Sequence, residues 1–177
     1  IEMYYRTRTY LAGDWDGDKN LIQQIYDWKR SGYLALDFTD AHDLTQSRDG
    51  SLNCTIKESL SKRMNASKTF VLVVGDKTNA VMSGSCSYCN SYFTYYQICF
   101  RDHPVDLRSY VKYECEKAAR DARNGVMRVV VIYNYMSVHR EKCPEAVRYL
   151  GTHIAGIYRD AIIDEISMLI KADENIA

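Results

Sequence analysis

The sequence predicts an α/β fold in which a parallel β-sheet carries helices on both faces. Apolar runs typical of strands alternate with segments of helical period along the whole chain, and this order favours parallel strands joined by helices. Two of the runs, at 69–75 and 127–133, are almost continuously apolar, as central strands covered on both faces usually are. The 177 residues are enough for a single domain with a full core.

The first half of the chain supplies three predicted strands and two predicted helices. A short strand at 7–12 ends in a turn rich in Gly and Asp, and the helix that follows has Gly32 as its stop. A second strand at 34–38 leads into a polar loop at 39–49, and a second helix then precedes the strand at 69–75. The apolar positions that predict the helices are Leu21, Ile22, Ile25 and Trp28 in the first, and Leu52, Ile56, Leu60 and Met64 in the second.

The second half begins with a long irregular segment and ends in an amphipathic helix. Residues 76–107 lack a clear period, and the part from about 83 to 107 is rich in Cys and Tyr, so we interpret it as an insertion into the single domain. The helix that follows ends near Asn124 and Gly125. The remaining predicted elements are a strand at 127–133, a loop at 134–143, a short helical piece at 144–149, a strand at 153–158 and a helix at about 159–173 with Ile162, Ile163, Ile166, Leu169 and Ile170 as its apolar positions.

The main functional signal is a carboxylate on the apolar face of the helix that precedes Asn124. Glu114 shares the inward stripe of this helix, whereas Glu116 faces outward and is placed to pair with Arg120 four residues on. An unpaired carboxylate on a buried face is costly, so Glu114 has a functional role, forms a structural ion pair or lies at the rim of the stripe. The stripe consists of Val111, Cys115, Ala118, Ala119 and Ala122.

The composition excludes several classes of function. Lys plus Arg and Asp plus Glu both number 23, so the zero net charge does not suggest bulk binding to nucleic acid or to an anionic membrane. The sequence has no apolar run long enough to span a bilayer and no signal-peptide pattern near its start, so we expect a cytoplasmic, reducing setting. No glycine-rich phosphate motif follows a predicted strand, which argues against a Rossmann dehydrogenase or a P-loop enzyme.

The cysteine-rich segment contains a possible zinc motif. Cys86, Cys89, Cys99 and His103 have the spacing C-x2-C-x9-C-x3-H, and a tetrahedral structural zinc needs four such ligands. The alternatives are packed thiols among tyrosines, which we favour, and a disulfide. We expect Cys54 to be a buried apolar group of a helix, and no catalytic cysteine is expected because the sequence shows no evident Cys–His pair.

Polar and aromatic residues follow the predicted strands at the edge where parallel sheets bind ligands. Trp15 could stack on a base and Asp14, with Asp16 beside it, could hold a ribose; the alternative is a capped turn whose Trp belongs to the core. His42 lies in an acidic loop and is either a pocket residue or a solvated histidine. Asn134 ends a central strand, where it either contacts a ligand or only forms the turn.

Taken in order, several segments resemble the bacterial TIR-like domains of Thoeris antiviral systems. Each segment alone is a weak signal, but the ordered set is fairly specific and covers most of the chain, roughly residues 7–158. The segments are Thr9–Asp18, Asp40–Asp43, Asn65–Gly75 and Tyr110–Glu114, followed by a helix and the strand that ends at Asn134.

The resemblance implies a flavodoxin-like sheet and cleavage of NAD at its nicotinamide–ribose bond. Members make an ADP-ribose-derived signal, often cyclic, that activates a partner effector during phage infection. The family's essential glutamate lies in an aromatic or apolar–basic–aromatic–Glu helix start, which falls on Val111–Glu114 here. We place the adjacent Tyr110 among the residues expected to bind NAD. The segment Ser83–His103 is longer than the usual connection and could cover or reshape the pocket.

A single inward carboxylate fits this chemistry. Nicotinamide leaves as a neutral molecule, so its departure needs no general acid, and Glu114 could stabilise the oxocarbenium-like state. Excluding water would turn hydrolysis into cyclisation or transfer. The expected partners are NAD, an effector reached through a diffusible nucleotide, a phage protein as trigger and a second copy of the chain. The alternatives are a non-catalytic TIR-like scaffold that senses a phage component or partner protein, and a regulatory domain that binds a nucleotide without cleaving it.

Overall fold

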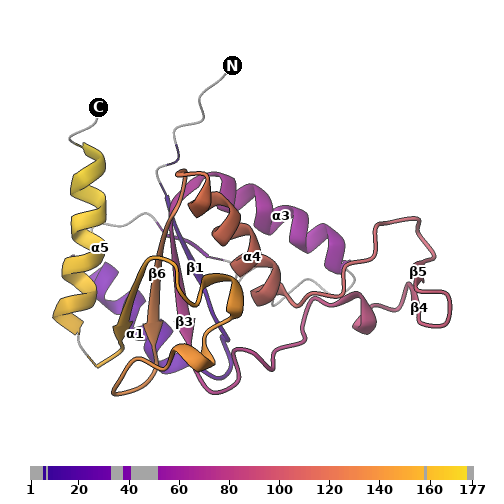
Figure 1. Ribbon diagram of the computed structural model, residues 1–177, viewed down its shortest axis with the longest axis horizontal. Helices are drawn as coiled ribbons and strands as arrows, with labels where there is room; N and C mark the ends of the chain where they lie inside the picture. Colours follow the sequence, from indigo (N-terminus) through magenta and orange to yellow (C-terminus); the bar gives the residue numbers. More distant parts are fainter. Residues whose placement is uncertain (1–5, 7, 33–37, 41–51, 158, 175–177) are drawn as a thin grey trace.

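The computed structural model describes residues 6, 8–32, 38–40, 52–157 and 159–174 (Figure 1). Its centre is a five-stranded sheet in the order β2-β1-β3-β6-β7, and every neighbouring pair is parallel. This order is the flavodoxin-like one, so the predicted fold class is confirmed. The strands are β1 (Arg8–Ala12), β2 (Phe38–Asp40), β3 (Ser67–Val74), β6 (Arg128–Tyr133) and β7 (Thr152–Ala155).

Helices cover both faces of the sheet and create two separate cores (Figure 1). Helices α3 (Asn53–Asn65) and α4 (Tyr110–Arg123) pack on one face, and α1 (Lys19–Arg30) and α5 (Arg159–Glu174) pack on the other. Alternate residues of β3 belong to opposite cores, and all of them from Phe70 to Val74 are fully buried. Burial on both faces explains why this strand is a continuous apolar run.

The cysteine- and tyrosine-rich segment forms a small arm that extends away from the sheet (Figure 1). It contains a 3-10 turn, η1 (Cys86–Tyr88), and an antiparallel hairpin of β4 (Tyr92–Phe93) and β5 (Ile98–Cys99). The sequence predicted only irregular structure here, because strands of two residues carry no period. The exposed aromatic side chains of the arm are Tyr88, Phe93, Tyr95, Tyr96 and Phe100.

The other predicted elements are present with small shifts at their ends. The second strand, predicted at 34–38, is described as Phe38–Asp40, and residues 33–37 lie outside the described residues. The short helical piece predicted at 144–149 is a 3-10 turn, η3 (Glu145–Val147), and a second 3-10 turn, η2 (Arg140–Lys142), lies in the segment predicted as loop. Within the part of the chain that the structure describes, no helix combines the length and the apolar character needed to cross a membrane.

Helix α5 holds its place through side chains that enter the core beside α1. Ile162 and Ile166 are fully buried there, and Ile163 packs at the rim. We expect Ile166→Ala to lower the free energy of unfolding by about 2–5 kcal/mol, the usual cost of a large-to-Ala change in a core. Urea denaturation measures it, and Met168→Ala is the matched control because Met168 is 59% exposed on the same helix. Equal stability of the two variants would contradict the packing of α5.

Candidate functional site

Glu114 lies inside the protein, between α4 and the sheet. Its exposed fraction is 2%, and the hydroxyl of Tyr10 on β1 donates a hydrogen bond to its Oε1. The inward position predicted from the helix period is therefore observed. Burial raises the pKa of Glu114 to about 8, although the hydrogen bond from Tyr10 acts in the opposite direction. At neutral pH the carboxyl group of the resting protein is mostly protonated.

Tyr10 was missed by the sequence analysis. It occupies the middle of β1, is fully buried and stacks on Phe70, its neighbour in β3, with ring centroids 5.9 Å apart. A tyrosine between apolar residues in a strand indicates core packing, and nothing local distinguishes it from phenylalanine. Only the need of a buried hydroxyl for a partner, combined with the inward Glu114, could have suggested the pair.

The predicted pairing of Glu116 with Arg120 is wrong. Glu116 instead accepts a hydrogen bond from Arg108 Nη1 at 2.7 Å, while Arg120 is exposed. Arg108 precedes Ser109, the residue that caps α4, and its planar guanidinium also binds Asp106 through Nε and Nη2. Because Asp106 already holds the guanidinium of Arg108, pairing with Glu116 costs little further side-chain entropy. This explains why Glu116 pairs with Arg108 rather than with Arg120.

A second polar centre lies at the carboxyl edge of the sheet, around Asp18. Asn134 follows β6, its backbone N–H donates to the carbonyl of Val74, and its side-chain Nδ2 donates to Asp18 Oδ1 at 2.7 Å. Asp18 is 2% exposed, and its Oδ2 has no hydrogen-bond partner among the described residues. Burial raises the pKa of Asp18, partly offset by Asn134. Asn134 thus positions a buried carboxyl group that the sequence analysis did not select.

The other predicted binding residues that the structure describes lie in two places, the turn after β1 and the start of α4. Asp14 accepts a hydrogen bond from the backbone of Asp16 in a turn near Asp18, and the half-buried Trp15 packs on Tyr26. Both observations agree with the capped-turn interpretation, and ligand binding by Asp14, Trp15 and the exposed Asp16 stays a prediction. His42 lies outside the described residues.

Tyr110 is directed towards α3 rather than towards Asp18. It is 7% exposed, and its hydroxyl donates to Asn53 Oδ1 at the start of α3 at 3.0 Å. Asn53 in turn donates to the carbonyl of Ser85, so these residues join α3, α4 and the arm. Burial, followed by the nearby cysteines of this junction, raises the pKa of Tyr110 to about 12. The observed role of Tyr110 is structural, and NAD binding by its side chain stays a prediction.

The close approach of Asp18 to Gly75 gives a direct test of the carboxyl edge. A Cβ at position 75 would lie 2.0 Å from Asp18 Oδ1, which Asn134 holds in place. We expect Gly75→Ala to destabilise the fold by about 1–3 kcal/mol, as overpacking usually does. Thermal denaturation in a double-mutant cycle with Asp18→Ala measures the coupling. A cost that does not shrink in the Asp18→Ala background would contradict the contact.

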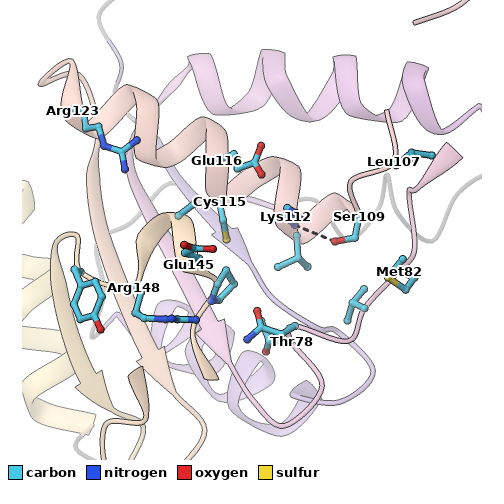
Figure 2. Close-up of a pocket in the computed structure, with 16 residues that line it drawn as sticks. Thr78, Met82, Leu107, Ser109, Lys112, Cys115, Glu116, Arg123, Glu145 and Arg148 are labelled. Carbon is cyan, nitrogen blue, oxygen red and sulfur yellow. Dashed lines mark hydrogen bonds between the residues drawn. The ribbon is translucent and has the colours of Figure 1, made fainter. Parts of the chain in front are cut away.

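A cavity of about 930 Å³ lies along α4 (Figure 2). Its walls include α4, the segment around η3 and residues 78–82, and Cys115, Glu145 and Arg148 line it. Glu114 does not line it, although its helix neighbours Val111 and Cys115 do. The lining mixes both charge signs with apolar side chains, so the cavity is suited to a polar small molecule but selects no particular one.

The predicted zinc ligands do not converge. Among the residues that the structure describes, no three His, Cys, Asp or Glu side chains gather closely enough to hold a metal ion. Cys86 Sγ accepts the backbone N–H of Asp106, and His103 Nδ1 lies 3.5 Å from Cys54 Sγ. Two expectations are corrected here: Cys54 is only half buried, and a Cys–His pair does exist, between residues far apart in the sequence. The zinc motif itself stays a prediction.

One comparison with known proteins bears on these sites. Residues 9–82 match the family model for the TIR-like domain of the Thoeris protein ThsB. The match confirms the predicted resemblance to Thoeris TIR-like domains. It supports a role in Thoeris defence, and it includes the turn around Asp18, whereas α4 with Glu114 lies beyond the matched residues. None of the curated proteins matches the chain.

Proposed function

We propose that this Thoeris TIR-like chain is an enzyme that cleaves NAD at the nicotinamide–ribose bond, with Glu114 as its catalytic carboxylate. The observation that carries the proposal is the burial of Glu114 at the start of α4 without a counter-ion among the described residues. A protein gains no stability from such a group, so its presence points to chemistry. Tyr10 is the described residue that hydrogen-bonds it.

The electrostatics suit a substrate that brings its own positive charge. The nicotinamide ring of NAD is cationic, and during cleavage this charge moves onto the ribose as an oxocarbenium-like state. An opposite charge nearby favours the ionised form of a carboxyl group, so binding of NAD would convert the protonated Glu114 to the carboxylate. The carboxylate then stabilises the positive charge in a low-dielectric site, where such stabilisation is strongest.

The depth of Glu114 also bears on the product. A site closed to bulk water favours attack on the ribose by a hydroxyl or base nitrogen of the same molecule over hydrolysis. We therefore propose an ADP-ribose-derived product, cyclic where the acceptor is internal, that reaches an effector protein by diffusion. Asp14, Trp15 and Asp16, with Asn134 holding Asp18, are proposed to form the part of the site at the carboxyl edge that holds the rest of NAD.

Nicotinamide release is the test of this proposal. The purified chain is incubated with NAD, and small molecules from phage-infected cells that express it are analysed by mass spectrometry, because a phage component could be needed as trigger. We expect free nicotinamide and an ADP-ribose-derived product that uninfected cells lack. Infected cells that are protected from phage while NAD stays intact and no such product forms would overturn the enzymatic function and favour a scaffold.

A further inference from the structure

The carboxyl group of Glu114 is held from one side only. Tyr10 donates to Oε1, and no described residue donates a hydrogen bond to Oε2. One oxygen of the group is therefore fixed by the protein, while the other is not committed to a described partner. The lone pairs of this second oxygen are available to accept a hydrogen bond from a ribose hydroxyl of a bound substrate.

Tyr10 is well suited to fix that oxygen because it cannot move easily. Strand β1 is paired on both sides, with Tyr10 opposite Thr39 of β2 and Phe70 of β3. Its ring is fully buried and stacked on Phe70 with 15° between the ring planes. The hydroxyl is thus set by the centre of the sheet rather than by a loop, and functional groups held by rigid elements are placed most accurately.

We propose that Tyr10 is a positioning residue for the reaction: it holds Oε1 of Glu114 so that the other carboxylate oxygen faces the ribose of NAD. This inference rests on the proposed function of Glu114 and adds a second residue, on a different element, to the same site. It does not require Tyr10 to touch the substrate.

Among the described groups around Glu114, Tyr10 is the one that favours the ionised carboxylate. On α4 the neighbouring Cys115 is a buried thiol, and burial, followed by Glu114 itself, raises its pKa. On α3 the buried Lys57 contacts Asp106 and the carbonyl of Arg108 instead. On β1 the Tyr10 hydroxyl lowers the pKa of Glu114 against the larger effect of burial. Removing this hydroxyl should therefore make the ionised form harder to reach.

The test compares two conservative changes in the same core, Tyr10→Phe and Tyr133→Phe. Tyr133 is a matched control: it is fully buried on central strand β6, but its hydroxyl contacts His153 Nδ1 at 2.8 Å and not Glu114. For Tyr10→Phe we expect kcat for nicotinamide release to fall about 10- to 100-fold, the usual effect of losing one hydrogen bond to a charged group, with KM little changed. The pH at which kcat reaches half its maximum should also rise.

The outcomes separate this inference from the proposed function. If Glu114→Gln abolishes nicotinamide release while Tyr10→Phe keeps the kcat and pH profile of the Tyr133→Phe control, Tyr10 is only a packing residue and the inference fails. If Glu114→Gln is itself fully active, the catalytic role of Glu114 fails first. A fall in kcat with an unshifted pH profile in Tyr10→Phe, matched by a similar fall in Tyr133→Phe, would indicate general loosening of the core and also overturn the inference.

Discussion

Glu114→Gln is expected to lower the rate of nicotinamide release about 100- to 1,000-fold, the typical loss on removing one preorganised group that stabilises transition-state charge. Gln keeps the shape of the side chain and can still accept the hydrogen bond from Tyr10, but it cannot become negative when positive charge develops on the ribose. The fold should survive, because the change removes the cost of burying an ionisable group. Chromatographic assay of free nicotinamide and circular dichroism measure the two effects.

Glu116→Gln is the matched control two positions along the same helix. Glu116 is half exposed and pairs with Arg108, so its loss should cost at most about 1 kcal/mol of stability and leave the rate unchanged. A fully active Glu114→Gln variant would show that the buried carboxylate has no part in the reaction. Full protection against phage by both variants would show that the chain acts by binding, as a scaffold.

The fold could be predicted from the sequence because its strongest signals are local. The alternation of strand-like and helix-like segments predicts the parallel sheet. The continuous apolar run of β3 predicts that this strand is buried on both faces. The inward position of Glu114 could be predicted from local sequence as well, because the helical period alone shows which face of a helix is buried. The sequence predicted an insertion at about 83–107 but not the hairpin within it, because strands of two residues show no periodic pattern.

The site could be predicted only in part because its contacts join distant segments. The partner of Glu114, Tyr10, lies 104 residues earlier on another element, and local pattern gives no information about that pairing. The Cys54–His103 contact spans 49 residues, and Asp18 meets Asn134 across 116 residues. Even the ion pair of Glu116 was assigned to the wrong cation, because the helix spacing rule ignores the preceding loop that holds Arg108.

Stability should fall as the pH rises through the range in which Glu114 ionises. The pKa of Glu114 is about 8 in the folded protein against an ordinary value of 4.5, so between these values the folded state binds more protons than the unfolded state. This contribution to stability is fully present below about pH 4.5 and is lost as the pH rises through 8. Urea unfolding at pH 5.5 and 8.5 should show a loss of up to about 1.4 kcal/mol per pH unit across the window.

Glu114→Gln isolates this effect from the rest of the protein. The variant carries no group that ionises at position 114, so its stability should stay flatter between pH 5.5 and 8.5 than that of the wild type, and it should be the more stable protein at the higher pH. Asp18, whose pKa is also raised by burial, contributes the same sign to both proteins and cancels in the difference. Parallel stability curves for wild type and variant would mean that Glu114 is ionised in the folded protein at neutral pH. The proton release proposed to accompany NAD binding would then not occur.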